Sequence, residues 1–166
     1  MNTTIMFAKT NPEAIIPSKR VEDAGFDIYP CFKEDYMILH PHTTTLVPTG
    51  IASVCDPSYC FILKERGSTG TKGIAQRCGV IDSGYRAEWF VPLSNNNDFP
   101  VIILKSGKDV YDKVRGVRYL VYPYEKAIAQ ALVVPVPEVE VCEVPMEYLQ
   151  SVPSERGNGA LGSSGK

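Results

Sequence analysis

Short runs rich in valine, isoleucine, tyrosine and threonine alternate along this chain with proline and glycine. Proline and glycine number 13 each, so breaks fall every few residues and leave little room for long helices. Because β-branched and aromatic residues favour strands, this spacing predicts an all-β sandwich or barrel. The predicted strands are Thr43–Val47, Tyr59–Leu63, Trp89–Leu93, Val101–Leu104, Val117–Val121 and Ala131–Val136.

The last third of the chain changes character twice. Val133–Val144 alternates valine with proline or glutamate, which predicts an edge strand because proline cannot donate to a ladder. One helical turn is expected over Pro145–Gln150, with Pro145 at its first position. The polar, glycine-rich end is too poor in apolar residues to pack a core, so it is predicted to be a mobile arm. The expected organisation is a β domain over residues 1–153 and an arm over residues 154–166.

Composition narrows the class of protein. A chain of 166 residues fits one domain, and a net charge of −2 gives no attraction toward nucleic acid or a membrane surface. No apolar run approaches the roughly 20 residues of a membrane span, and no signal-peptide pattern is visible, so an intracellular protein is expected. The five cysteines lack metal-ligand spacing, which predicts reduced, mostly buried thiols. His40 and His42 are expected to be solvated loop residues.

The segment Gly79–Trp89 carries the most informative chemistry. A β-branched run delivers one carboxylate, Asp82, into a turn, and the ring of Tyr85 follows three residues later. Glycines bracket the pair and allow backbone to approach a ligand closely. A carboxylate can orient a water molecule, and an aromatic ring can pack against a sugar. The competing interpretation is an ordinary turn with an exposed aspartate.

Two glycine-rich basic segments are candidates for phosphate binding. Lys64–Gly73 offers an arginine, hydroxyl groups and open backbone N–H groups, which can form a nest for an anion. Arg156, followed by glycines and serines, has the same chemistry in the final segment. Taken singly, the first segment is by default a solvated connector, and for the final segment a disordered end or a cloning remnant competes with an arm that closes over an anionic ligand.

Five short motifs occur in a characteristic order. They are Ala24-Gly25-Phe26-Asp27-Ile28, Arg66-Gly67-Ser68-Thr69, Gly79–Glu88, Ala127-Ile128-Ala129-Gln130 and Arg156–Gly165. This order and spacing resembles the trimeric dUTP pyrophosphatase (dUTPase) family from about residue 20 onward. The resemblance implies a distorted jelly-roll or β-barrel subunit with little helix. It also implies hydrolysis of dUTP to dUMP and pyrophosphate, which limits uracil in DNA and supplies dUMP.

The resemblance also implies a role for each matching residue. Asp82 would hold the attacking water, with Gln130 beside it as the second catalytic residue. Tyr85 would lie under the deoxyribose, and the hairpin around Gln76–Ile81 would read uracil through its backbone. The implied substrate-binding residues are Arg66, Gly67, Ser68, Gln76, Gly79, Val80, Ile81, Tyr85, Arg156, Leu161, Gly162 and Ser163. Mg²⁺ is expected to bind through the substrate phosphates, with Asp27 in its outer shell.

The implied assembly is a homotrimer with shared active sites in the cytoplasm, or in the host cytoplasm if the protein is viral. Some positions depart from the family pattern. Gly67 replaces a serine, Ala127 an arginine, Leu161 a phenylalanine that stacks on uracil, and Gly84 a common aspartate. The segment between the third and fourth motifs is longer than is usual in the family, by a stretch of about 20 residues around Asn96–Arg118.

Two other classes of function stay open. The related dCTP deaminases use a glutamate to activate water for attack on cytosine, and Glu88 is the candidate for that role here. A nucleotide-sensing or protein-binding role is the second alternative, suggested by the Asn96–Arg118 insert and by the missing serine at position 67.

Overall fold

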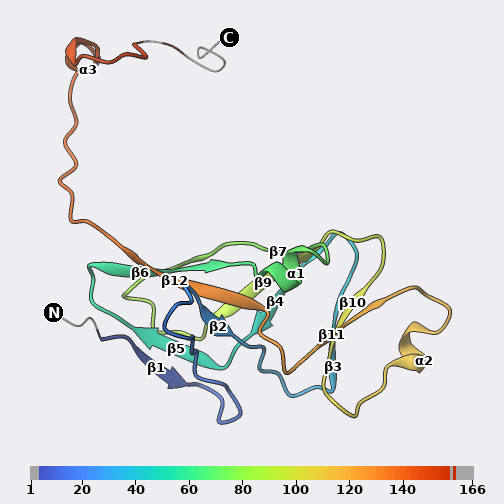
Figure 1. The fold of residues 1–166 in the computed structure, drawn as a ribbon. Coiled ribbons are helices and arrows are strands. Elements are labelled where there is room, and N and C mark those ends of the chain that lie inside the picture. The colour runs from blue at the N-terminus through green and yellow to red at the C-terminus, as the bar shows by residue number, and fades with distance from the viewer. Residues whose placement is uncertain (1–3, 158, 160–166) are drawn as a thin grey trace. The chain divides into compact units, whose positions relative to one another are not determined.

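The computed structural model describes residues 4–157 and 159 of the chain, and most of its regular structure is β (Figure 1). Two compact units are present, Met1–Val136 and Pro137–Lys166. The strands are β1 (Met6–Lys9), β2 (Phe26–Ile28), β3 (Tyr36–Leu39), β4 (Thr44–Pro48), β5 (Ile51–Val54), β6 (Tyr59–Lys64), β7 (Ile74–Gln76), β8 (Val80–Ile81), β9 (Phe90–Asn95), β10 (Val101–Leu104), β11 (Leu120–Pro123) and β12 (Ala129–Pro135). The helices are α1 (Gly67–Gly70), α2 (Tyr111–Val114) and α3 (Met146–Ser151).

The strands form small sheets that share one core. The largest has the order β2-β12-β6-β8, and two three-stranded sheets have the orders β4-β9-β7 and β11-β10-β3. β1 and β5 pair antiparallel as a separate ribbon. No helix among the described residues is long and apolar enough to cross a membrane. The twelve strands of the described residues and their pairing into these sheets confirm the expected all-β class.

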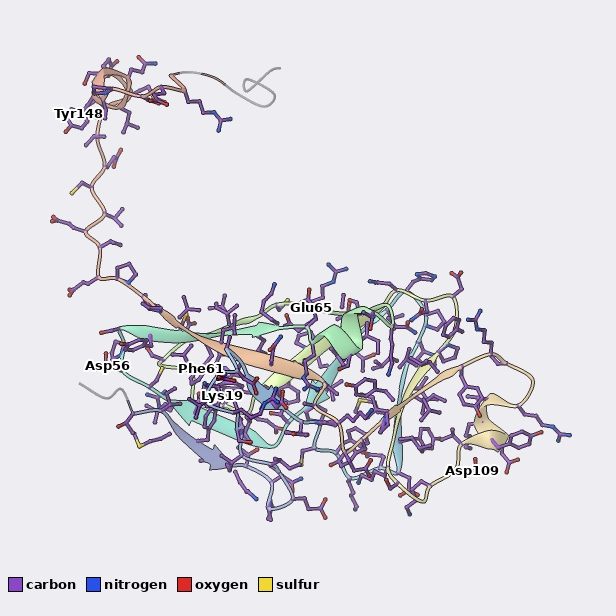
Figure 2. All side chains as sticks on the ribbon, in the orientation of Figure 1. Lys19, Asp56, Phe61, Glu65, Asp109 and Tyr148 are labelled. Carbon is purple, nitrogen blue, oxygen red and sulfur yellow. The ribbon has the colours of Figure 1, made fainter. Side chains whose placement is uncertain are left out.

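β6 is one of the two inner strands of the largest sheet, and its burial pattern shows why its sequence forms a strand. Its residues alternate, so that Phe61 and Leu63 are buried while the neighbouring residues are more exposed. Trp89 packs edge-on against Phe61 with ring centroids 4.9 Å apart, and Phe7 contacts both rings. Figure 2 labels Phe61 among these strands. This aromatic cluster fixes the sheet on which the candidate site is built.

Each of the six predicted strands overlaps an observed strand, with ends that agree to within three residues, and Val101–Leu104 has the same bounds as β10. The edge strand over Val133–Val144 is wrong beyond Pro135, where β12 ends. Pro135 and Pro137 each lack an N–H group, so the alternation of valines there cannot be continued as a ladder. The strands that the prediction omitted are short, as β2 and β8 illustrate.

The Pro145–Gln150 turn is present as α3, although Pro145 is the N-cap residue and not the first helical residue. Contacts divide the chain between Val136 and Pro137, earlier than the boundary at 153/154 that composition predicts. Between these points the side chains of Val139 and Val141 are 71% and 90% exposed. Residues 137–153 therefore belong with the C-terminal unit and not with the β unit.

All five cysteines are free, but the expectation of mostly buried thiols is only partly correct. Cys31 and Cys55 are buried, and burial raises the pKa of each thiol. Cys60 is half-buried, whereas Cys78 and Cys142 are exposed. His40 and His42 lie outside the strands and are exposed, as predicted.

Candidate functional site

Three adjacent strands of the largest sheet bring the first, second and fourth motifs together. Asp27 on β2 faces Gln130 on β12, and Gln130 faces Lys64 at the end of β6. Arg66 follows two residues later and forms a two-pronged ion pair with Asp27. Its Nε lies 3.1 Å from Oδ1, and its Nη2 donates to Oδ2 at 3.3 Å. The two side chains are 31% and 33% exposed, so the pair faces a solvent-accessible recess.

Gln130 is held in this cluster by its neighbours. Its Nε2 donates to the carbonyl oxygen of Glu65 at 3.0 Å, which leaves the amide oxygen directed elsewhere. Gly25 lies against the same side chain, because a methyl group at Gly25 would be 2.6 Å from Oε1 and 2.9 Å from Cβ of Gln130. Only glycine fits here without a shift of Gln130.

The loop after β6 is shaped by its own hydroxyl groups. The backbone N–H of Arg66 donates to Oγ1 of Thr69 at 3.1 Å, and that hydroxyl donates back to the Arg66 carbonyl at 2.9 Å. Thr71 donates to the carbonyl of Gly67 at 2.7 Å. Ser68 is exposed and lines the recess, while a methyl group at Gly67 would meet nothing within 4 Å. The hydroxyl group of Ser68 therefore lines the recess next to position 67, which has no side chain.

Two open cavities of about 580 and 530 Å³ adjoin this cluster and share Asp27, Arg66 and Gln130 as lining residues. The first is also lined by Ser18, Lys19, Arg20, Asp23, Ala24 and Gly25. The second is also lined by Tyr29, Gly67, Ser68, Glu125, Lys126 and Ala127. Their linings are mainly polar and charged, which suits a charged, flexible ligand such as a phosphate chain.

Several of these lining residues were not predicted from the sequence. Lys19, Arg20 and Tyr29 lie near the first motif, and Glu125 and Lys126 lie immediately before the fourth. Their proximity to the motifs in the chain was the only available signal, because charged surface residues have no periodicity of their own.

The third motif lies at the edge of the same sheet. β8 delivers Asp82 into a turn that is closed by a hydrogen bond from the N–H of Tyr85 to the Asp82 carbonyl at 3.0 Å. Asp82 is exposed, and the Tyr85 hydroxyl donates to the carbonyl of Glu88 at 3.0 Å. That bond fixes the ring, which remains 40% exposed, beside the carboxylate-bearing turn.

Close packing of Gly79 holds this turn on β6. The Gly79 carbonyl accepts from the N–H of Leu63 at 2.7 Å, and a methyl group at Gly79 would lie 2.5 Å from the Leu63 carbonyl oxygen. The β-branched Ile81 is buried on the inner face. Gly79 thus allows a close approach to the backbone of β6, whereas the prediction from the sequence concerned approach to a ligand.

The expected hairpin around Gln76–Ile81 is wrong as a paired hairpin. β7 pairs with β9 and β8 pairs with β6, so the segment passes from one sheet to another. Cys78 has a positive φ of 48° at the bend between them. A left-handed non-glycine residue gives little sequence signal, which is why the pattern suggested a simple hairpin.

Asp82 does not join the cluster of Asp27, Arg66 and Gln130 within one chain. The register places Asp82 about four residues, or about 13 Å, along the strands from Gln130. β8 and β12 flank β6 on opposite sides, about 10 Å apart. Figure 2 labels Asp56, which lies in the turn before β6, and Glu65, which directly follows β6; the register places Asp82 toward the Asp56 side. The two Cα atoms are therefore about 16 Å apart.

Glu88, the alternative water-activating acid, is engaged in the structure. Its Oε1 accepts from the N–H of Gly50 at 2.7 Å, and the side chain is half-buried. A carboxylate that ties two segments of backbone together is not presented to a ligand. This geometry disfavours the deaminase interpretation.

Carboxylates in the described residues suit a metal ion that keeps most of its water. Among residues 4–157 and 159, no group of three or more His, Cys, Asp or Glu side chains could enclose a metal. Asp27 and Asp23 line the first cavity, and each is paired with an arginine. Asp27 and Asp23 are therefore the carboxylates of the first cavity that could face a hydrated divalent cation.

The arm begins with a short ordered turn. Arg156 donates from Nε to the carbonyl of Gly159 at 3.0 Å, and its N–H donates to the Ser154 hydroxyl at 3.2 Å. The predicted residues Leu161, Gly162 and Ser163 lie outside the described residues.

Known proteins provide an independent comparison. A family model described as dUTPase matches residues 11–108. A deoxyuridine 5'-triphosphate nucleotidohydrolase of Neisseria meningitidis is 34% identical over 146 residues, which cover 86% of this chain and 81% of the relative. The protein of the same name from Gloeobacter violaceus is 36% identical over 146 residues, which cover 86% of this chain and 83% of the relative.

Solved structures show the same fold. A dUTPase mutant of Staphylococcus bacteriophage 80alpha, solved with dUpNHpp, superposes with a TM-score of 0.76 at 23% identity, over 98% of this chain and 99% of that chain. A dUTPase of phage phi11, described as showing a species-specific insert, gives a TM-score of 0.68 at 20% identity, over 85% and 96%. With the family model, the curated relatives and the fold in agreement, this chain belongs to the dUTPase family.

Proposed function

We propose that this protein hydrolyses dUTP to dUMP and pyrophosphate. The observation that carries the proposal is the pair of half-sites on one sheet. One is an exposed aspartate beside a fixed tyrosine ring, and the other is a recess lined by Arg66, Ser68 and Gln130. The relatives that carry the name deoxyuridine 5'-triphosphate nucleotidohydrolase support the substrate.

In the proposed step, a water oxygen forms a bond to the α-phosphorus while the bond from that phosphorus to the α–β bridging oxygen breaks. Pyrophosphate leaves with the electron pair, and the water proton passes to the carboxylate of Asp82, with Gln130 beside the water. Arg66, Ser68, Arg156 and glycine-rich N–H groups would stabilise the charge on the phosphates. Mg²⁺, when bound, would add charge neutralisation at the phosphate oxygens.

Selection for uracil and deoxyribose would come from the third motif. The Tyr85 ring, held by its bond to Glu88, would lie under the deoxyribose and leave no space for a 2′ hydroxyl. Backbone groups between Gln76 and Ile81 would read the uracil edge. Gly79 supports this assignment, because its close approach to Leu63 fixes that backbone on β6.

The proposal is tested by measuring pyrophosphate release, in the presence of Mg²⁺, from dUTP and from each canonical nucleoside triphosphate. Hydrolysis of dUTP is expected, with little release from UTP, dTTP or dCTP. Ammonia release from dCTP would replace the proposal with the deaminase alternative. Binding of dUTP without hydrolysis would favour the sensing role, for which the insert around Asn96–Arg118 remains the candidate surface.

We further propose that the working assembly is a homotrimer with sites shared between subunits. The separation of about 16 Å between Asp82 and Gln130 supports this, because both groups cannot reach one phosphorus within a chain. The exposed Val139 and Val141 support a segment that packs on another copy. Size-exclusion chromatography with light scattering tests the assembly, and a fully active monomer would refute it.

Replacing Gly25 by alanine is expected to reduce dUTP turnover about tenfold, because the added methyl group must displace Gln130 from the cluster. Overpacking of this kind also costs about 1–3 kcal/mol of stability. Steady-state kinetics and thermal melting measure the two effects. Gly84→Ala is the stability control, since its methyl group would meet nothing within 4 Å. Unchanged turnover in Gly25→Ala would remove Gln130 from the proposed site.

A further inference from the structure

Four cationic side chains line the two cavities beside the cluster: Lys19, Arg20, Arg66 and Lys126. Three of them already have partners. Lys19 donates to three backbone carbonyls, the shortest at 2.7 Å to Asp23, and so stabilises its own loop. Arg20 pairs with Asp23 at 2.9 Å.

Arg66 is the third engaged cation. Its ion pair with Asp27 cancels its charge to first order, so these two residues together present a nearly neutral surface to a triphosphate. A ligand with several negative charges needs additional positive charge in the recess, even with a divalent cation bound.

Lys126 is the remaining cation. It is exposed and lines the second cavity together with Arg66, Ser68 and Gln130. Its ammonium group makes no hydrogen bond or ion pair with any residue in the described part of the chain. A flexible lysine stem with three donors can follow a phosphate chain as a mobile point charge.

Neither chain neighbour of Lys126 is ion-paired with it among the described residues, although Glu125 lines the same cavity. The Glu125 carboxylate accepts from the N–H of Ser106 at 2.9 Å, and this bond holds the pKa of Glu125 below its ordinary value. Ala127 is buried, and its carbonyl accepts from the Tyr122 hydroxyl at 2.7 Å and from Arg66 at 3.4 Å. Position 127 therefore shapes the backbone and contributes no charged side chain.

We propose that Lys126 is a substrate-binding residue that contacts the β- and γ-phosphates of the nucleotide. This inference rests on the proposed function, because it assigns a further ligand contact to the same recess. Lys126 gives the triphosphate a cation that is not already paired, at a position outside the five motifs. It discriminates a nucleoside triphosphate from the monophosphate product.

The test compares Lys126→Ala with wild type for dUTP hydrolysis and for binding of dUpNHpp and dUMP. Lys126→Ala should raise KM for dUTP and Kd for dUpNHpp about tenfold while leaving dUMP binding within about twofold. Lys126→Arg should keep most of the affinity, because it keeps the charge. Lys113→Ala, on α2, removes another exposed lysine and is the control.

Equal dUpNHpp affinity in wild type and Lys126→Ala would overturn the inference. An equal loss of dUMP and dUpNHpp binding would overturn it too, since it would indicate general damage to the site. Wild-type protein that binds dUpNHpp without hydrolysing dUTP would contradict the proposed function alone, and the binding comparison would still decide the role of Lys126.

Discussion

Asp82→Asn is expected to lower kcat for dUTP by at least ~10²-fold, because an amide cannot accept the proton of the attacking water. The turn itself should persist, since its closing hydrogen bond joins the N–H of Tyr85 to the Asp82 backbone carbonyl. The carboxylate and the amide have nearly the same shape, so affinity for dUpNHpp should stay close to wild type. Single-turnover kinetics and calorimetry separate the two quantities.

Asp112→Asn provides the matched control, because Asp112 is an exposed acid on α2 outside both half-sites. Its kcat should equal that of wild type. If Asp82→Asn also turned over at the wild-type rate, Asp82 could not be the general base.

Deletion of Ser154–Lys166 should lower kcat/KM for dUTP by at least ~10²-fold while shifting Tm by less than about 2 °C. The deleted segment lies in the C-terminal unit, outside the compact unit that ends at Val136. It carries Arg156 and the glycine–serine run that would cover the phosphates. Loss of Arg156 alone, as Arg156→Ala, should reproduce part of the effect, and Glu155→Gln should have none.

Thermal melting and kinetics on the same preparation distinguish a functional arm from a structural one. A truncated protein that melts far below wild type would show that the segment supports the fold. Full activity after truncation would show that the nucleotide is bound without it.

The β architecture could be predicted because the local signals agree with the fold. Tyr59–Leu63 and Val101–Leu104 are bounded by breaks and rich in strand-forming residues, and both contain strands that bury alternate or consecutive side chains. β2 and β8 were missed because runs of three and two residues carry almost no pattern. The strand does not continue to Val144 as predicted, because Pro135 and Pro137 lack the N–H groups that a ladder beyond this point would need.

The order of the motifs predicted the site residues, but the sequence did not predict which of these residues lie together in space. Which of Asp27, Arg66 and Gln130 meet is decided by strand register, and register follows from the packing of the whole sheet. The distance of Asp82 from this cluster has the same origin. Lys126 and Arg20 gave no sequence signal beyond their proximity to the motifs, since a charged surface residue acquires a role only from the groups that the fold places beside it.

The central claim is that Asp82 of one copy acts on a nucleotide held by the Arg66–Asp27–Gln130 cluster of another. Co-expression of Asp82→Asn with Arg66→Ala tests it most directly. An assembly of either variant alone has a defective half-site in each of its shared sites. In a closed trimer that contains both variants, one of the three shared sites combines two intact half-sites, so about a third of wild-type turnover is predicted for the purified mixed assembly. Mixed assemblies as inactive as either parent would show that both half-sites must come from the same chain, and would contradict the account.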